Sequence, residues 1–359
     1  MTENNSGGER PLLKVIDLKK HFRVRGKNEE GKTGIVKAVD GISFEVPAAR
    51  TFGLVGESGC GKSTAAHTFM RLIEPSGGQV LFEDRDVLAM SARDLKAFRR
   101  EVQLIFQDPY ASLNPRFTVG EIIGEPLVIH KIGNKKERIA RAKELLDTVG
   151  LNPEHINRYP HEFSGGQRQR IGIARALALD PKLIVCDEPV SALDVSIQAQ
   201  ILNLLEDLQQ QHGIAYLFIA HDLSVVQHIS DEVAVMYLGK IVEHSDWRGL
   251  YEKPHHPYAQ CLLSAVPLPD PDLQNERQRI LLAGDPPSPI DPPSGCHFHT
   301  RCPLAQSDPE KLALCSSEEP PLREVAPGHQ CACHYAAPYP ISPELAAKHS
   351  KAVEVAEAS

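Results

Sequence analysis

Short apolar runs alternate with longer amphipathic stretches along most of this chain of 359 residues. The apolar runs have the length and composition of strands, and they predict strands at residues 12–18, 36–46, 51–55, 79–83, 102–106, 183–186 and 215–220. Apolar residues at helical spacing predict helices at 135–149, 166–179 and 195–211. A further helix is predicted between a glycine-rich loop at residue 56 and residue 73, and a short one after residue 221. Strands that alternate with helices in this way predict an α/β fold with a mainly parallel sheet, covered on both faces.

The character of the chain changes after about residue 265. Prolines interrupt any regular element there and indicate a stiff linker or a wrapping loop: Pro286, Pro287, Pro289, Pro292 and Pro293. Five of the eight cysteines then follow between residues 296 and 333, and in a reducing cytosol such crowding favours metal or cluster binding over disulfides. We therefore predict a disordered N-terminus at 1–10, an α/β domain at 11–265, a proline- and cysteine-rich C-terminal module at 266–335 and a flexible tail at 336–359.

Charge and hydropathy narrow the class of protein. A net charge of −8, from 47 acidic and 39 basic residues, gives no electrostatic support for a nucleic-acid partner or an anionic membrane surface. No apolar stretch approaches the roughly 18 residues that a membrane span needs, and the N-terminus MTENNSGGER has no apolar signal segment. We expect a cytoplasmic polypeptide that touches a membrane only through another protein.

The sequence GESGCGKST at residues 56–64 fits the phosphate-loop pattern G-x-x-x-x-G-K-[ST] and follows a predicted strand. Glycines allow successive backbone N–H groups to surround a phosphate, and the following helix directs its positive end at the same anion. Lys62 can reach the β- and γ-phosphates of a nucleotide, and the hydroxyl of Ser63 can bind Mg²⁺. A glycine turn that merely starts a helix would leave this Lys-Ser pair unexplained. We therefore predict that a nucleotide is bound by Gly56, Glu57, Ser58, Gly59, Cys60, Gly61, Lys62, Ser63 and Thr64.

Two carboxylates end the apolar run LIVCDEP at residues 183–189. Asp187 at the end of the predicted strand is suited to hold Mg²⁺, directly or through water. Glu188 beside it is suited to orient and polarise the water that attacks a phosphate. The alternative, a merely polar strand end, is disfavoured by the phosphate loop upstream.

With the segment FSGGQRQRIGIARAL at residues 163–177, the chain resembles the ATP-binding subunits of ATP-binding-cassette (ABC) transporters. Phe163 stands where leucine is more common, and the signature motif of that superfamily is matched by Ser164, Gly165, Gly166 and Gln167. The resemblance implies an ABC-type nucleotide-binding domain at 11–265, with an antiparallel β subdomain and a helical signature subdomain. It also implies that ATP lies between the phosphate loop of one subunit and the signature motif of a partner.

The implied catalytic set is completed by two further positions of the family pattern. Gln107, in LIFQDP, corresponds to the glutamine that senses Mg²⁺ and water, and His221, in FIAHD, to the histidine that contacts the γ-phosphate. With Glu188 they form the implied catalytic residues of an ATPase, while Mg²⁺ would be held by Ser63, Gln107 and Asp187.

Two more positions follow from the same resemblance. The sequence SALD at 191–194 matches the loop that crosses the dimer interface. Phe22, in KKHF, falls where the family places an aromatic ring that stacks on adenine. A lone aromatic residue at a strand end is more often a core residue than a nucleotide contact.

Within the superfamily, the chain is most similar to the second ATPase subunit of bacterial dipeptide and oligopeptide importers. The similarity lies in the stretches 107–127, 158–170, 187–205 and 284–305, the last reading GDPPSPIDPPSGCHFHTRCPLA. It implies an ATPase that powers peptide import, peripheral to the cytoplasmic side of the inner membrane. The implied partners are a second ATPase subunit, either a paralogue or another copy, two transmembrane permease subunits and an extracytoplasmic peptide-binding protein.

Three other functions are alternatives. Nickel and glutathione importers share much of this pattern, and no residue of the pattern is known to touch a peptide. A soluble cassette ATPase of DNA repair, chromosome structure or translation is disfavoured, because the chain has one cassette and no long heptad insertion. An exporter ATPase is disfavoured by the importer-type C-terminal tail.

Four cysteines fall where peptide-importer ATPases keep a cysteine-rich tail, in which some members hold an iron–sulfur cluster: Cys296, Cys302, Cys315 and Cys333. Four thiolates can bind a [4Fe–4S] cluster or a structural Zn²⁺, and the ligand type does not separate the two. Cys331 would be a spare or substitute ligand, and free cysteines packed in a small module are the third alternative. His255 and His256 stand between prolines in KPHHPY, and we predict that they belong to a surface loop.

Overall fold

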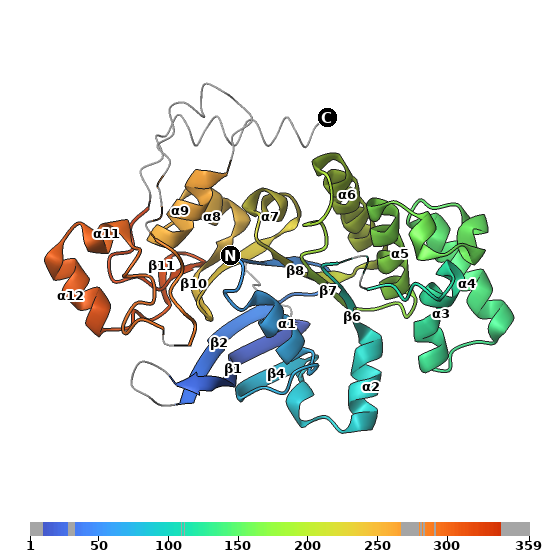
Figure 1. The fold of residues 1–359 in the computed structure, drawn as a ribbon, viewed down its shortest axis with the longest axis horizontal. Helices are drawn as coiled ribbons and strands as arrows, with labels where there is room; N and C mark the ends of the chain where they lie inside the picture. Colours follow the sequence, from blue (N-terminus) through green and yellow to red (C-terminus); the bar gives the residue numbers. More distant parts are fainter. Residues whose placement is uncertain are drawn as a thin grey trace, which may run out of the picture.

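Figure 1 shows a computed structural model of the chain, in which two β-sheets are surrounded by helices. The structure describes residues 10–27, 33–108, 110, 112–266, 280, 282, 284–290 and 292–338. The larger sheet has eight strands in the order β11-β12-β10-β9-β3-β8-β7-β6, and the smaller has four in the order β2-β1-β4-β5. The α/β class predicted from the alternating pattern is confirmed.

The larger sheet has a parallel core. β3 (Thr51–Val55) lies between β8 (Ala215–Ala220) and β9 (Glu232–Tyr237), and β7 (Leu183–Asp187) joins β8 to β6 (Val102–Ile105). β3, β7 and β8 are buried along their whole length, as expected for strands covered on both faces. Because the carboxyl ends of parallel strands meet at one edge of a sheet, the loops that follow these strands gather there.

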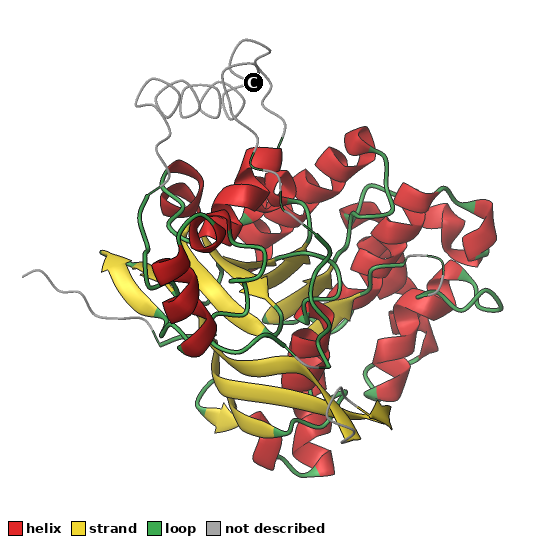
Figure 2. Ribbon diagram, turned by 60° about the vertical axis from the view of Figure 1, so that its left-hand side comes forward, coloured by secondary structure: helices red, strands yellow, loops and turns green. Residues whose placement is uncertain are grey.

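The smaller sheet is antiparallel and forms a second layer beneath the larger one in Figure 2. β1 (Leu13–Lys27) pairs with β2 (Thr33–Val46) and with β4 (Gly77–Phe82), which pairs with the short β5 (Arg85–Asp86). The first two strands are longer than predicted, because their register continues as far as the pair Lys27 and Thr33. The apolar side of this sheet shares a core with α1 (Lys62–Phe69) and α2 (Ala92–Glu101).

Three helices form a group at the right of Figure 1: α3 (Val119–Ile129), α4 (Lys135–Thr148) and α5 (Gly165–Leu177). Each begins at a capping box, in which the N-cap side chain and the side chain of the third helical residue bind each other's backbone N–H group. The N-cap residues are Thr118, Asn134 and Ser164. The helices predicted at 135–149 and 166–179 are therefore confirmed, and their ends differ by at most two residues.

Between residues 195 and 265, some helices were predicted from the sequence and other regular elements were not. α6 (Val195–His212) and α7 (Leu223–Ile229) match the predictions. The strand β9, the antiparallel strand β10 (Lys240–Asp246), and the helices α8 (Trp247–Glu252) and α9 (Pro257–Ala265) were missed. β9 and β10 are joined by a tight turn at Leu238 and Gly239, so no long polar segment separates them in the sequence.

The cysteine-bearing segment is continuous with the rest of the fold. Its elements are α11 (Pro303–Gln306), α12 (Pro309–Ser317), β11 (Arg323–Ala326) and β12 (His329–Cys331). β12 pairs with β10, which extends the larger sheet across the predicted boundary at residue 265. Phe298, Cys302 and Cys315 belong to the same apolar core as α5 and α6. The segment is therefore packed into the preceding domain, and the exact domain boundaries stay predictions.

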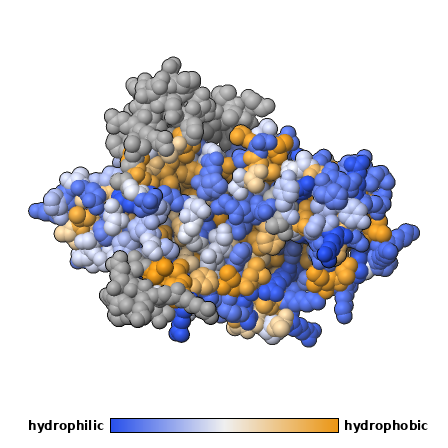
Figure 3. All heavy atoms as spheres, in the orientation of Figure 1, coloured by the Kyte–Doolittle hydropathy of each residue, from blue (hydrophilic) through white to orange (hydrophobic). Residues whose placement is uncertain are grey.

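No helix among the described residues is long and apolar enough to cross a membrane. The face shown in Figure 3 is largely hydrophilic, and its apolar patches are scattered between polar residues. The predicted disordered N-terminus at 1–10 and flexible tail at 336–359 fall almost entirely outside the described residues.

Candidate functional site

The predicted phosphate loop joins β3 to α1 at the carboxyl edge of the larger sheet. Gly61 has a φ of 112°, and a Cβ there would lie 1.9 Å from the carbonyl oxygen of Ala38 on β2. Gly56 has a φ of 155°, and a Cβ there would lie 2.2 Å from the carbonyl oxygen of Met236 on β9. β2 and β9 therefore hold the loop from two sides, and only glycine fits at both positions.

Lys62 begins α1 and directs its ammonium group back into the loop. Its Nζ donates hydrogen bonds to the carbonyl oxygens of Gly56 at 2.8 Å and Glu57 at 3.0 Å. The residue is buried, with 4% of its surface exposed. A buried cation at a glycine-rich loop and a helix N-terminus is suited to bind a polyanion.

Ser63 and Asp187 meet although 124 residues separate them, because α1 begins beside the carboxyl end of β7. Ser63 Oγ donates to Asp187 Oδ1 at 2.7 Å. Burial raises the pKa of Asp187, and the hydrogen bond from Ser63 opposes this rise. A hydroxyl and a carboxylate are oxygen ligands of the kind that Mg²⁺ prefers. Two of the three predicted Mg²⁺ ligands thus lie together, whereas Gln107 is hydrogen-bonded to Glu188.

Two of the three predicted catalytic side chains converge on a carboxylate oxygen of the third, Glu188. Gln107 Nε2 donates to Oε2 of Glu188 at 2.8 Å, and His221 Nδ1 lies 3.1 Å from the same oxygen. The three residues follow β6, β7 and β8, which are adjacent and parallel. Glu188 has a φ of 47°, and its N–H donates to the carbonyl oxygen of Ile219 at 2.9 Å. A left-handed residue with a Cβ persists only where its surroundings fix it, and such positions are concentrated at functional sites.

The predicted signature motif forms the start of α5. Ser164 Oγ accepts a hydrogen bond from the Gln167 N–H at 3.4 Å, and the Gln167 side chain accepts one from the Ser164 N–H at 3.1 Å. A Cβ at Gly166 would lie 2.5 Å from Cγ2 of Ile197, so the glycine allows α5 to approach α6 closely. Figure 1 shows α5 among the helices at the right, well separated from α1 at the centre. Within one copy of the chain, the signature motif therefore does not reach the phosphate loop.

Phe22 lies on β1, where it pairs with Val36 of β2. This register places Phe22 near Ala38, whose carbonyl oxygen contacts the phosphate loop at Gly61. The ring is only half-buried, and Lys20 Nζ lies 4.7 Å from its centroid. Phe22 is therefore not a core residue, and its stacking on adenine stays a prediction.

Two residues that contact the phosphate loop were missed by the sequence analysis. Tyr258 of α9 accepts a hydrogen bond from the N–H of Glu57 at 2.9 Å. Arg301 donates to the Glu57 carboxylate through Nη1 at 2.8 Å and Nη2 at 3.2 Å. They lie 201 and 244 residues beyond Glu57, so no local pattern could have identified them.

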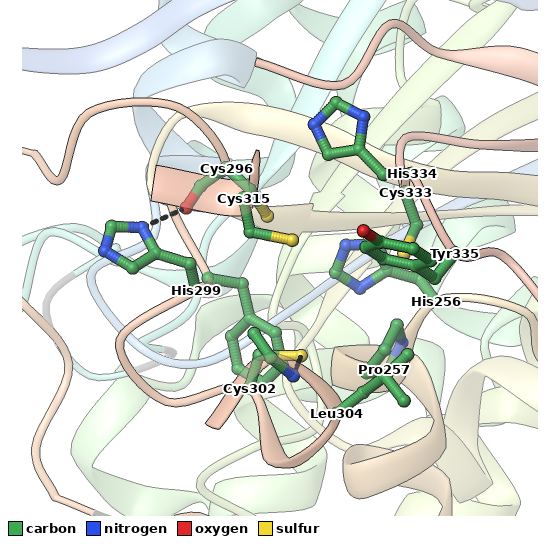
Figure 4. Close-up of a pocket in the computed structure, with 12 residues that line it drawn as sticks. His256, Pro257, Cys296, His299, Cys302, Leu304, Cys315, Cys333, His334 and Tyr335 are labelled. Carbon is green, nitrogen blue, oxygen red and sulfur yellow. Dashed lines mark hydrogen bonds between the residues drawn. The ribbon is translucent and has the colours of Figure 1, made fainter. Parts of the chain in front are cut away.

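The four cysteines predicted as ligands line one small cavity. In Figure 4 their sulfur atoms turn toward a shared space: Cys296, Cys302, Cys315 and Cys333. Cys331 is buried on β12 but does not line this cavity. Burial raises the pKa of Cys296 to about 12 and that of Cys333 to about 11. These thiols are therefore protonated at neutral pH unless a metal displaces their protons.

The spacing of these thiols bears on the metal they fit. Two sulfur ligands of one Zn²⁺, each about 2.3 Å from the ion, lie at most about 4.6 Å apart. Within the described part of the chain, three metal-binding side chains have ligand atoms that all lie within 4.8 Å of one another, and they are Glu243, His255 and His329. Among the described residues, no three of these cysteine thiols lie this close together.

The prediction that His255 and His256 form a surface loop is wrong. Both are buried, and their backbone N–H groups donate hydrogen bonds to the Glu243 carboxylate at 2.7 Å and 2.9 Å. His329 Nε2 of β12 lies 2.6 Å from the same carboxylate. Pro257 begins α9, and the buried Glu243 of β10 ties the segment before this helix to His329 of β12.

Two family models match the chain. Residues 39–191 match the ABC transporter model, and this range contains the phosphate loop, the paired carboxylates and the signature motif. Residues 242–308 match the model of the C-terminal region of oligopeptide/dipeptide transporters. That second range contains Tyr258 and Arg301.

Curated relatives match the chain over most of its length. The putative oligopeptide transport ATP-binding protein YkfD of Bacillus subtilis (strain 168) is 55% identical over 325 residues, 90% of this chain and 95% of YkfD. The oligopeptide transport ATP-binding protein AppF of the same strain is 52% identical over 92% of this chain and 98% of AppF. A putative peptide import ATP-binding protein of Brucella ovis is 54% identical over 90% of this chain and 98% of its own length.

Solved structures share the cassette part of the fold. The ATP-binding cassette MJ0796, a dimer in a post-hydrolysis state bound to ADP and phosphate, has a TM-score of 0.59 and 28% identity, and the match covers 66% of this chain and 99% of MJ0796. CbiO1 of Clostridium perfringens, part of the ABC transporter complex cbiONQ, has a TM-score of 0.57 and 26% identity over 67% of this chain and 90% of CbiO1. With more than half of its residues identical to YkfD over 90% of its length, the chain belongs to the ATP-binding proteins of oligopeptide and dipeptide ABC transporters.

Proposed function

We propose that this chain hydrolyses ATP to power the import of di- or oligopeptides through an ABC transporter. The observation that carries the proposal is the convergence of Gln107 and His221 on Oε2 of Glu188. Glu188 directly follows Asp187, which is hydrogen-bonded to Ser63 of the phosphate loop. Polar side chains gathered at the carboxyl edge of a parallel sheet are typical of a catalytic site.

The residues of the site divide the chemistry among them. The loop N–H groups and Lys62 would bind the β- and γ-phosphates of ATP. Ser63 and Asp187 would hold Mg²⁺, which supplies positive charge to the transferred phosphoryl group. Glu188 orients water for in-line attack on the γ-phosphate and accepts its proton. Gln107 and His221 fix the Glu188 carboxylate, and His221 also stabilises the charge that spreads over the phosphoryl oxygens.

A second ATPase subunit would complete the site. The helix start at Ser164 is suited to bind an anion, but it lies far from the phosphate loop of its own chain (Figure 1). ATP would therefore lie between the phosphate loop of one subunit and the signature motif of a paralogue or another copy. Val195, next to the predicted interface loop at 191–194, is 81% exposed, as expected for an apolar side chain that a partner covers. MJ0796, which shares the cassette part of the fold, is a dimer bound to ADP and phosphate, and this supports pairing of two ATPase subunits.

Membrane subunits would convert this cycle into transport. Closure of the ATPase pair on ATP and its reopening after hydrolysis would shift two permease subunits between outward- and inward-open states. Exposed aromatic side chains in the segment that follows β6 offer these subunits a contact surface: Phe106, Tyr110 and Phe117. An extracytoplasmic binding protein would deliver the cargo, and the ATPase would sit at the cytoplasmic face of the inner membrane.

Peptides are favoured as the cargo because the relatives are named for oligopeptide and peptide transport. Nickel and glutathione stay alternatives. The test deletes the gene and measures cellular uptake of a radiolabelled dipeptide, a tripeptide, ⁶³Ni²⁺ and glutathione. We expect loss of peptide uptake alone, restored by the wild-type gene and not by a Lys62→Ala gene. Loss of nickel or glutathione uptake with intact peptide uptake would reject the peptide assignment.

We further propose that the four cysteines of the small cavity hold a [4Fe–4S] cluster. Two observations support it: the thiols face one space (Figure 4), and no three of them lie as close together as the ligands of one Zn²⁺. Such a cluster takes four cysteine ligands and supplies a redox-active cross-link when bound. Anaerobically purified protein is expected to contain about four iron and four sulfide ions per chain. Zinc in place of iron, or no metal, would contradict the assignment.

A further inference from the structure

We propose that Arg301, from the C-terminal segment, positions the phosphate loop for ATP by holding and neutralising Glu57. The inference rests on the proposed ATP-binding function, because its readout is the affinity for ATP. Glu57 is the residue that follows the first glycine of the loop at 56–64. Arg301 is 6% exposed, so its charged group is largely removed from water.

The contact between the two residues is an ion pair with two hydrogen bonds. Arg301 Nη1 donates to Oε2 of Glu57 at 2.8 Å, and Nη2 donates to Oε1 at 3.2 Å. This paired geometry is the strong and directional form of the interaction, and a lysine cannot reproduce it. An arginine guanidinium stays charged at every physiological pH, so the ion pair keeps its positive partner.

An aromatic cluster holds Arg301 in place. The Arg301 N–H donates to the carbonyl oxygen of Phe298 at 3.0 Å, which closes a tight turn. The Phe298 ring lies 5.2 Å from the ring of Tyr237 and 5.3 Å from that of Tyr258, between centroids. Since Tyr258 also accepts the N–H of Glu57, one cluster anchors both partners of the ion pair.

Glu57 is consequently fixed at three points before any nucleotide binds. Arg301 holds its side chain, Tyr258 holds its N–H group, and Lys62 Nζ donates to its carbonyl oxygen at 3.0 Å. A loop that is already in its binding conformation loses less conformational entropy when the ligand arrives. The fixed loop also keeps Lys62, the cation of the phosphate site, in position.

The charge of Glu57 explains why an arginine is needed here. A carboxylate in a loop that binds a triphosphate repels its ligand unless a cation compensates for it. Arg301 supplies that cation from a segment 244 residues away. Packing alone would require only a side chain of similar volume, whereas charge compensation predicts that the two residues depend on each other.

The same turn links the ATP site to the cysteine cavity. Phe298 and Cys302 both line that cavity, and Arg301 directly precedes Cys302 in the sequence. The C-terminal segment thus contacts the phosphate loop through one charged side chain, rather than only covering the sheet edge.

The test measures the dissociation constant of radiolabelled ATP, with Mg²⁺, for the purified full-length chain by equilibrium dialysis. Arg301→Met leaves Glu57 unpaired beside the triphosphate, and we expect affinity to fall about tenfold. Adding Glu57→Gln to Arg301→Met removes the repelling charge, and most of the lost affinity is expected to return. Arg301→Lys keeps the charge and is expected to bind more tightly than Arg301→Met.

A matched control breaks another ion pair between the C-terminal segment and the rest of the fold. Glu319→Gln removes one of the two acidic partners of Lys240, outside the phosphate loop, and is expected to leave ATP affinity unchanged. Unaltered affinity in Arg301→Met, or a double variant as weak as the single one, would overturn the inference. Cooperative unfolding on heating shows whether Arg301→Met is folded. If it is not, the double variant is compared with the single variant Glu57→Gln, and the inference requires both to bind ATP with the same affinity. Wild-type protein that binds ATP no better than Lys62→Ala would instead reject the proposed function.

Discussion

At the scale of single residues, the site depends on contacts that the sequence can only partly reveal. Lys62, Ser63, Asp187 and Glu188 stand in short patterns whose spacing reflects local chemistry, so they could be identified from the sequence. That Ser63 Oγ reaches Asp187 could not be seen, because 124 residues separate the two. The same limit hid Arg301, whose role depends on a turn built around Phe298.

The prediction for the two histidines of KPHHPY was wrong, rather than missing. Prolines on both sides indicate an irregular turn, and irregular turns are usually exposed. His255 and His256 are nevertheless buried, because their N–H groups satisfy the carboxylate of Glu243. Glu243 lies in β10, whose sequence KIVEHSD gives no local sign that this glutamate is buried or of the partners it needs.

Glu188→Gln tests the central catalytic assignment. The amide keeps the size of the side chain but cannot accept the proton of the attacking water. We expect ATP binding to persist and hydrolysis to fall by at least about 100-fold. Phosphate release and ATP binding are measured on one preparation, with Glu144→Gln of α4, an exposed glutamate, as the matched control. Retained hydrolysis in Glu188→Gln would remove Glu188 from its assigned role.

At the scale of elements, the sequence predicted well where periodicity was strong. Buried strands such as β7 and β8, and amphipathic helices such as α4 and α6, are within two residues of their predicted ends. The strands β9 to β12 were missed, because two are joined by a tight turn and two are four residues long or shorter. β9 is held in the sheet by pairing with β3, and β12 by pairing with β10, and both pairs join segments that lie far apart in the sequence.

Two glycines of α5 give a matched prediction about helix packing. Gly166→Ala would place a Cβ 2.5 Å from Ile197 and push α5 away from α6, so we expect a loss of about 1–3 kcal/mol in unfolding free energy. Gly172→Ala meets nothing within 4 Å and replaces a poor helix former, so it is expected to stabilise the protein by up to about 1 kcal/mol. Urea unfolding of both variants measures the difference. Equal effects would show that α5 and α6 do not pack as described.

At the scale of the whole molecule, the two proposed halves of the ATP site, the phosphate loop and the signature motif, lie in different parts of the described chain. The phosphate loop lies at the centre and the signature motif among the helices at one end (Figure 1). The sequence suggested this separation only through resemblance to a family, since spacing along a chain does not give distance in space. The fold explains this separation. The phosphate loop and α1 follow β3, a central strand of the larger sheet, whereas α5 packs with α3 and α4. In the proposed function, a partner subunit therefore supplies the second contact with the nucleotide.

The most direct test is a cryo-electron microscopy structure of the assembled transporter, trapped with ATP and Mg²⁺ in the Glu188→Gln form. We predict that the γ-phosphate lies within about 3 Å of Lys62 Nζ on one side and of a signature serine from the partner ATPase on the other. A nucleotide held by one subunit alone, with the partner's signature motif turned away from it, would contradict the proposed coupling of ATP hydrolysis to transport.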